Sequence, residues 1–520
     1  MSLIDLLLAA ESAETRTAVR RTAYRHVHVV DSPLVVVAYN LSGEAAAPLG
    51  IMYGVGPKVE DASLVVAAEP RNRESRFALI NSFAADVVNH LEPFLELREV
   101  EADNGSTQRV TLSAPQVVVP NRATRAFIGA RLGRSLRYLG LGDTHEVPDA
   151  TPWTGAHLSW LAEHSQLPGQ STFLAATEAL AFHFVTGQSA LEDENLATLL
   201  AWIEGLPEDP LASLEDLENS AYGPVPDPRW EAVIEPWVKQ YSDGLRSEEP
   251  AKSEEALSNI RDAVEEKLAD AYLATHRAID ILRTLPPARS VPDRWNNDVR
   301  EWTEHARRCE RGMPRFARRH DAIRAARTLQ RWSSAADSFA MDQAFDDPMI
   351  MARYDAEGLC LSGTIAVVDP NNREVKRGQT NRTRVPLIEL NLSGTTQLLP
   401  GDTVRWTEDR RVRAEIRRLD ETRSLLAVLG GVRTFDASHL AIGGVVMFVA
   451  LDPWEGRDPL SPDEVPWTHR EATTSELTED REGDVPTAGE DGSPDLTTFE
   501  LGQISIVGEV SPGDEPGVVL

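Results

Sequence analysis

The chain has 520 residues, 42% of them hydrophobic, which is enough to build more than one domain. Its 52 basic and 82 acidic residues give a formal net charge of −30, which argues against nonspecific nucleic-acid binding by the molecule as a whole. Two cysteines, Cys309 and Cys360, exclude a disulfide framework and a cysteine-rich zinc site. Without a run of about 18 apolar residues or a basic, cleavable leader, we expect a cytoplasmic protein without membrane contact.

The overall pattern predicts a multidomain α+β protein. Residues 1–148 predict an α/β domain, because apolar runs such as LVVVAYN and QVVVP flank a helical pattern over residues 76–96. Residues 149–248 predict a helical bundle with a core of tryptophans, namely Trp153, Trp160, Trp202, Trp230 and Trp237. In this bundle His157 and His164 lie seven residues apart, but no HExxH spacing accompanies them, so we predict no metal and no cofactor.

Residues 249–348 predict a long antiparallel helical hairpin that projects as a stalk. From Ser253 to Pro286, apolar residues recur at steps of three and four, as in a coiled-coil seam. A second helical pattern covers residues 295–345, with a break or kink at Pro314. The guanidinium group of arginine can bind phosphate oxygens through two parallel hydrogen bonds. This second segment carries a cluster of such residues: Arg307, Arg308, Arg311, Arg315, Arg318, Arg319, Arg324 and Arg327.

Residues 349–454 predict a small closed barrel of OB or SH3-like type, because six or seven short strands of period two alternate with turns. In RRVRAEIRRL, an outer face of Arg411, Arg413, Glu415 and Arg417 alternates with apolar residues. Arg405 and Trp406 on the preceding strand supply a cation and a ring, as in OB-type modules that hold single strands. The alternative is a solvated arginine face balanced by neighbouring acids.

The end of the chain is acidic. Residues 455–496 are rich in Pro, Gly, Ser, Thr and acids, which predicts a disordered linker, and residues 497–520 predict one terminal strand segment. Residues 455–500 hold 14 acids and three arginines, whereas residues 300–331 hold ten arginines and four acids. The acidic linker is therefore a candidate to occupy the basic surface when no nucleic acid is bound.

The sequence contains no complete catalytic motif. It lacks GxxxxGK[ST], GxGxxG, GxSxG and HExxH, so we predict no catalytic residues and leave enzymatic activity open. One alternative is a hydrolase or nuclease in the α/β domain that uses Asp31, Glu69 and either His26 or His28. Another is a scaffolding subunit whose stalk pairs with a partner helix.

The stretch PGDTVRWTEDRRVRAEIRRLDETRSLLAVL, residues 400–429, follows the long helices and opens with a Gly-Asp turn. This arrangement resembles the accessory region of superfamily 1 helicases of the nonsense-decay type, in which a stalk and a barrel are inserted near the first motor domain. The resemblance covers about residues 250–452 and the final GDEPGVVL, which looks like the strand that leads into a phosphate-binding loop. The loop itself has no counterpart here, and residues 1–245 lie outside the resemblance.

Together these features predict a non-catalytic, nucleic-acid-associated module or subunit of an ATP-dependent helicase-type motor. The expected partners are DNA or RNA and an ATPase, and the expected contacts are the two arginine groups. The sequence does not distinguish DNA from RNA, and it leaves open whether the motor is a separate chain.

Overall fold

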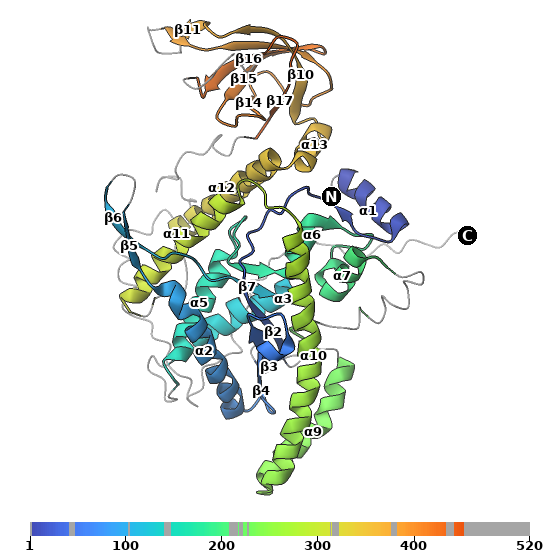
Figure 1. Ribbon diagram of the computed structural model, residues 1–520, viewed down its shortest axis with the longest axis vertical. Coiled ribbons are helices and arrows are strands. Elements are labelled where there is room, and N and C mark those ends of the chain that lie inside the picture. Colours follow the sequence, from blue (N-terminus) through green and yellow to red (C-terminus); the bar gives the residue numbers. More distant parts are fainter. Residues whose placement is uncertain are drawn as a thin grey trace, which may run out of the picture.

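The structure is a computed structural model that describes residues 3–40, 47–101, 105–139, 147–206, 217, 222–225, 228–312, 314, 322–375, 382–432 and 441–451. An α/β body carries a separate β-barrel at one end (Figure 1). At the other end lies the tip of a helix pair, α9 (Pro228–Arg246) and α10 (Pro250–Thr284) (Figure 1). Among the described helices, none has both the length and the apolar character needed to cross a bilayer.

The body is built on a five-stranded mixed sheet in the order β4-β3-β2-β7-β8. Its strands are β2 (Leu34–Asn40), β3 (Pro48–Gly54), β4 (Ser63–Val66), β7 (Val117–Val119) and β8 (Phe173–Ala175). β2, β3 and β4 form an antiparallel meander, whereas β7 and β8 run parallel to β2 and to each other. Every residue of β2 is buried because both faces of the sheet are covered, which explains its continuous apolar sequence.

One face of the sheet is covered by α2 (Arg73–Leu95), α5 (Ala150–His164) and the π-helix η2 (Ala126–Gly133). Alternate residues of β2, Val36 and Ala38, point into this layer, where they join Phe83, Leu158 and Trp302 in one core. The short helices α3 (Arg122–Arg125) and α4 (Arg134–Leu136) flank η2.

The other face is covered by α9 (Pro228–Arg246) and α10 (Pro250–Thr284). The predicted apolar seam exists, but it packs against the sheet: Val264 and Leu268 share a core with Val35 and Val37. A Cβ on Gly50 of β3 would lie 2.5 Å from Val264 Cγ1, so the helix approaches the strand too closely for any side chain there. The expectation of a projecting stalk formed by this seam is therefore wrong, because the sheet already covers it.

The antiparallel helical hairpin is instead formed by α11 (Val291–Glu310) and α12 (Ala322–Asp346). The backbone N–H of Ser290, just before α11, donates to Asp346 at 2.6 Å, and Arg331 of α12 pairs with Glu301 of α11 at 2.8 Å. Residues late in α12 thus lie beside the start of α11, so the chain reverses between the two helices. The predicted break near Pro314 falls in this reversal.

Residues 149–248, predicted as a separate helical bundle, contribute directly to the α/β body. β8 lies in the sheet, and Leu158 and Leu161 of α5 belong to the core on one of its faces. α6 (Ala176–His183) and α7 (Leu196–Glu204) pack with the end of α10 in a smaller core. The remaining elements are α1 (Leu3–Thr15), β1 (Val19–Arg20), η1 (Val59–Asp61), β5 (Arg98–Glu101), β6 (Thr107–Val110), β9 (Phe184–Val185) and η3 (Glu192–Glu194).

The predicted closed barrel is confirmed. Its order is β10-β13-β16-β15-β14-β17, and all neighbouring strands are antiparallel. The strands are β10 (Cys360–Asp369), β13 (Leu387–Leu392), β14 (Thr403–Trp406), β15 (Arg413–Leu419), β16 (Arg423–Gly430) and β17 (Val445–Val449). A small hairpin of β11 (Arg373–Val375) and β12 (Arg382–Arg384) extends from it. Closure leaves the barrel without an exposed sheet edge.

Asp347 ties the barrel's supporting helix to the body. It caps α13 (Pro348–Ala356) by accepting from the Met349 N–H at 2.9 Å. Its other oxygen accepts from the N–H groups of Ala23 and Tyr24 at 2.7 and 3.1 Å and lies 3.2 Å from His26 Nε2. Although burial alone would raise it, these hydrogen bonds hold the pKa of Asp347 below its ordinary value.

Candidate functional site

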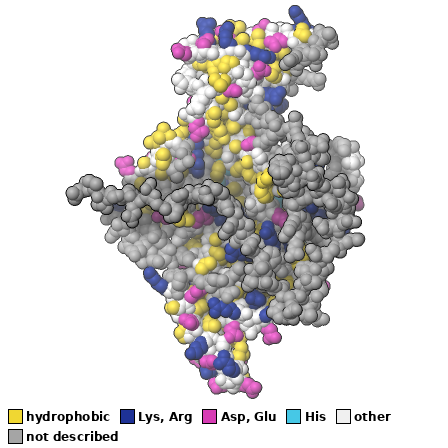
Figure 2. Space-filling model, turned by 180° about the vertical axis from the view of Figure 1, so that it is seen from behind, with side chains coloured by type: hydrophobic (Ala, Val, Ile, Leu, Met, Phe, Trp, Pro, Cys, Tyr) yellow, Lys and Arg dark blue, Asp and Glu magenta, His cyan; other side chains and the backbone are white. Residues whose placement is uncertain are grey.

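The predicted alternation of the arginine-rich barrel strand is confirmed. Val412, Ala414 and Ile416 are fully buried in the barrel core, and the arginines between them point outward. Arg411 pairs with Asp409 at 2.9 Å, and Arg417 pairs with Glu415 at 2.8 Å. Arg405 donates to the backbone oxygen of Arg410, and Arg413 is half-buried. Figure 2 shows basic and acidic side chains interspersed on the visible face of the barrel.

Trp406 lies on the opposite side of its strand from Arg405. Its side chain is only 5% exposed and belongs to the barrel core together with Leu361 and Phe448. In this arrangement the ring stabilises the barrel and offers no face on which a base could stack. Of the predicted barrel contacts, the outward arginines are therefore the groups within reach of a ligand.

The helical arginines lie on the α11–α12 hairpin, apart from Arg315, Arg318 and Arg319, which fall outside the described residues. Arg307 pairs with Glu304 and donates to the backbone oxygen of Arg109. Arg308, Arg311 and Arg327 are exposed and make no ion pair with another described residue. Arg324 is likewise exposed on α12.

A cleft of about 780 Å³ lies between this hairpin and the edge of the α/β body. It is lined by Arg294, Arg300 and Arg307 of α11, by Arg331 of α12 and by Gln108 and Thr111 of the body. Four acidic side chains, Asp298, Glu301, Glu304 and Asp342, also line it. Arg331 and Glu301 are each about half exposed, at 53% and 44%, so solvent screens their ion pair and a competing anion can replace the carboxylate at little cost.

A histidine–aspartate pair lies at the floor of the cleft. His164 Nε2 is 2.7 Å from Asp298 Oδ1, and Asp298 Oδ2 accepts from the Ser171 N–H at 2.7 Å. The His164 ring also stacks on Trp160 with 4.7 Å between ring centroids. Both carboxylate oxygens are thus occupied, and among the described contacts no nucleophilic hydroxyl meets the imidazole. The pair fixes the segment after α5 to α11.

The carboxyl ends of β2 and β7 form the place where open α/β sheets usually bind ligands, because the chain leaves these neighbouring strands in opposite directions. Here β2 ends at Asn40, and Asn121 follows the end of β7. Asn121 Nδ2 donates to the Gly223 oxygen at 2.9 Å, and the Asn40 N–H donates to the Pro224 oxygen at 2.6 Å. A Cβ on Gly223 would lie 2.5 Å from the Ala38 oxygen. The protein's own loop therefore fills this crevice.

The residues of the hydrolase alternative have separate partners. Glu69 accepts from Ser242 of α9, whereas His26 contacts Asp347 at the start of α13. These two helices lie at opposite ends of the body (Figure 1). His28 stacks on Trp295 at 4.4 Å, and Asp31 is exposed and accepts from Arg283 through its backbone oxygen. These contacts do not assemble a shared site.

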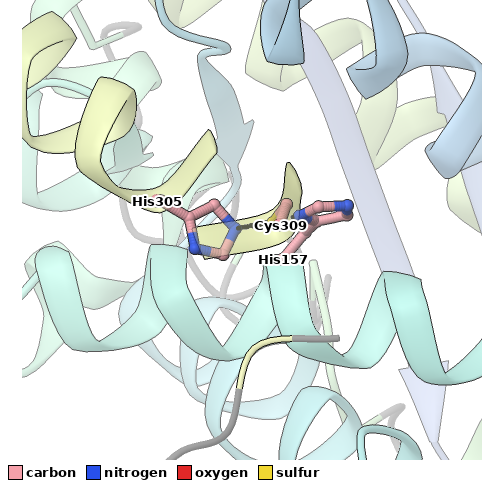
Figure 3. A group of neighbouring side chains, drawn as sticks. All are labelled: His157, His305 and Cys309. Carbon is pink, nitrogen blue, oxygen red and sulfur yellow. Dashed lines mark hydrogen bonds between the residues drawn. The ribbon is translucent and has the colours of Figure 1, made fainter. Parts of the chain in front are cut away.

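Three other side chains converge in the interior and were not predicted as a group. His157 comes from α5, and His305 and Cys309 come from one face of α11 (Figure 3). His157 Nδ1 lies 3.0 Å from His305 Nε2, which lies 3.6 Å from Cys309 Sγ. All three donor atoms lie within 4.8 Å of one another. We call these residues the His–His–Cys cluster.

The His–His–Cys cluster is buried and uncharged in the absence of a ligand. Burial lowers the pKa of His157 to about 4 and holds the pKa of His305 well below its ordinary value. Burial also raises the pKa of the Cys309 thiol to about 12. Tryptophan rings surround the group, with Trp160 and Trp302 centred 5.3 and 5.0 Å from the His305 ring.

Comparisons with family models, with curated proteins and with solved structures give no significant match. Function must therefore be argued from the sites themselves.

Sequence reasoning identified the arginines of α11 and α12 but missed the cleft and the His–His–Cys cluster. The spacing of His305 and Cys309, four residues apart on a helix, was an available signal because it places both on one face. The third member, His157, is separated from His305 by 148 residues, so no local pattern joins them.

Proposed function

We propose that the chain is a non-catalytic, nucleic-acid-associated module that serves an ATP-dependent, helicase-type motor. The observation that carries this proposal is the cleft along the α11–α12 hairpin, where four arginines line a groove of about 780 Å³. The four arginines of the cleft face four acidic side chains. The basic excess comes from exposed arginines of the same hairpin that have no ionic partner among the described residues: Arg308, Arg311 and Arg327.

In the proposed binding mode, a phosphate oxygen replaces the side-chain oxygen that each arginine now contacts. Each exposed arginine of the cleft now contacts a side chain that a phosphate oxygen could replace: Arg300 donates to Asn297, and Arg331 pairs with Glu301. A surface ion pair contributes little to stability, so releasing Glu301 costs little. Guanidinium groups bind phosphate oxygens through two parallel hydrogen bonds, which favours the exchange.

The barrel supports the same proposal through position and charge. It follows the arginine-bearing hairpin directly through α13, and its outer arginines, such as Arg417, also contact exchangeable acids. A stalk that pairs with another helix finds less support, because the apolar seam of α10 is buried against the sheet.

The test is fluorescence anisotropy of labelled single- and double-stranded oligonucleotides with the R300Q/R331Q variant. If both arginines contact phosphates, affinity falls and the slope of log affinity against log salt becomes shallower by about 1.4 for a single strand. The matched control is R246Q/R277Q, which removes the same charge from exposed arginines on α9 and α10. Equal losses in both variants would indicate a general charge effect and refute binding in the cleft.

A further inference from the structure

The His–His–Cys cluster brings three metal-binding atoms together from two helices that pack across the core (Figure 3). For tetrahedral or trigonal angles, an ion with bonds of about 2.0 Å to nitrogen and about 2.3 Å to sulfur separates two nitrogens by about 3.3 to 3.5 Å. It separates nitrogen from sulfur by about 3.5 to 3.7 Å. The observed separations are 3.0 Å between the two nitrogens and 3.6 Å between His305 Nε2 and Cys309 Sγ. Two of the three separations are thus close to those of a metal centre, and all three donor atoms lie within 4.8 Å of one another.

One nitrogen of His305 faces away from the cluster contacts, and the other makes both of them. His305 Nδ1 is buried and has no hydrogen-bond partner among the described residues, while Nε2 of the same ring contacts both other members of the cluster. Coordination through Nε2 would leave the proton on Nδ1 and would not give that nitrogen a partner. The support for a metal site is therefore the convergence of the three donor atoms in a buried place.

We propose that His157, His305 and Cys309 form a binding site for a monovalent soft metal ion, with Cu(I) as the best match. Two imidazoles and one thiolate are ligands that soft d10 ions accept, and three ligands suffice for the trigonal geometry that Cu(I) adopts. The neutral imidazoles coordinate through His157 Nδ1 and His305 Nε2. The Cys309 sulfur supplies the third ligand, 3.6 Å from His305 Nε2.

Charge selects the monovalent ion. Binding replaces the thiol proton of Cys309, which leaves to solvent, so a Cu(I)–thiolate centre has no net charge. A Zn²⁺–thiolate centre would leave one positive charge in a pocket lined by Trp160 and Trp302, which is costly in a medium of low polarity. The charged side chain that acts most directly on His305 and Cys309 is Arg308, and its positive charge further disfavours a divalent ion.

The site would also join the two layers that it bridges. His157 belongs to α5 on the sheet, whereas His305 and Cys309 belong to α11, which lines the arginine cleft on its other side. Because an ion that binds the folded state stabilises it by mass action, loading should raise the stability of the α5–α11 contact. The inference stands without the proposed function, since it depends on the three ligands alone.

The experiment is an anaerobic titration of the reduced full-length protein with Cu(I) against bicinchoninate as competing chelator, with Ag(I) and Zn²⁺ in parallel. We expect one Cu(I) per chain and a loss of affinity of at least about 100-fold in C309S, since even supporting residues of metal sites cost about 10- to 100-fold. C360S is the matched control, because Cys360 is also buried but lies at the barrel. Ag(I) should follow Cu(I).

Three results would overturn the inference. The wild type could bind Cu(I) no more tightly than C309S does, or C309S and C360S could lose Cu(I) affinity equally. The third is 1:1 binding of Zn²⁺ by the wild type in preference to Cu(I). Should C309S fail to fold, X-ray absorption of the Cu(I)-loaded wild type decides. One sulfur and two nitrogen ligands are expected, and a copper environment without sulfur would contradict the site.

Discussion

Buried neutral histidines should make the α/β body sensitive to acid, and His157 offers the sharpest test. Its side chain is 1% exposed, and burial lowers its pKa from 6.5 to about 4. Protonation therefore favours the unfolded chain. The free energy of unfolding that neutral His157 contributes is present above pH 6.5 and is lost as the pH falls from 6.5 towards 4. At about 1.4 kcal/mol per pH unit, the whole loss is about 3 kcal/mol.

The assay is urea unfolding of metal-free wild type and H157Q between about pH 7.5 and 4.5, followed by tryptophan fluorescence. Near pH 5 the unfolded chain binds nearly one more proton than the folded chain at this residue. H157Q should therefore reduce the slope of unfolding free energy against pH by about 1.2 kcal/mol per pH unit, whatever its effect at pH 7.5. His183, whose pKa burial also lowers to about 4, remains and keeps part of the slope.

The control is C309A, which removes a neighbouring side chain that does not titrate in this range, because burial raises the pKa of the Cys309 thiol to about 12. C309A should lower stability at every pH by a similar amount. If H157Q and wild type had parallel stability curves, His157 would not be the neutral buried group described here, and the reasoning would be refuted.

Three further predictions follow from the packing and charge. Val264→Ala, which removes two buried methyl groups between α10 and the sheet, should cost about 2 kcal/mol in chemical unfolding, whereas the exposed Val233→Ala should change stability by less than about 0.5 kcal/mol. Asp347→Ala leaves the Ala23 and Tyr24 N–H groups without their acceptor, so it should cost about 3 kcal/mol and speed proteolysis between body and barrel; unchanged cleavage would contradict this contact. Removing residues 455–520 should increase oligonucleotide affinity at low salt, and equal affinities would remove the proposed competition by the acidic segment.

The alternation of the barrel strands was predictable because its information is local. In β15 a period of two places Val412, Ala414 and Ile416 inside. Turns join β14 to β15 and β15 to β16, but the other pairings of the barrel join strands that are not successive. In α10 the helical period likewise predicted the buried side chains, since Ile260, Val264 and Leu268 recur four residues apart. Local pattern thus identifies which face of an element is apolar.

Local pattern does not identify what that face meets. The seam of α10 is equally compatible with another helix and with a sheet, and only the tertiary structure places it against Val35 and Val37. β8 has only three residues and sits among helices, so its place in the sheet depends on pairing with β7. The His–His–Cys cluster and the cleft are harder still, because each joins segments more than a hundred residues apart.

The most direct test of the proposed function is an anisotropy titration of the wild-type chain with single- and double-stranded DNA and RNA over a series of salt concentrations. We predict binding at low salt, with a log affinity that falls linearly with log salt. The slope should be about −1.4 or steeper, since two phosphate contacts on a single strand give about −1.4. Absence of binding to every oligonucleotide at low salt would contradict the proposal and leave the arginines of α11 and α12 as a surface balanced by their own acids.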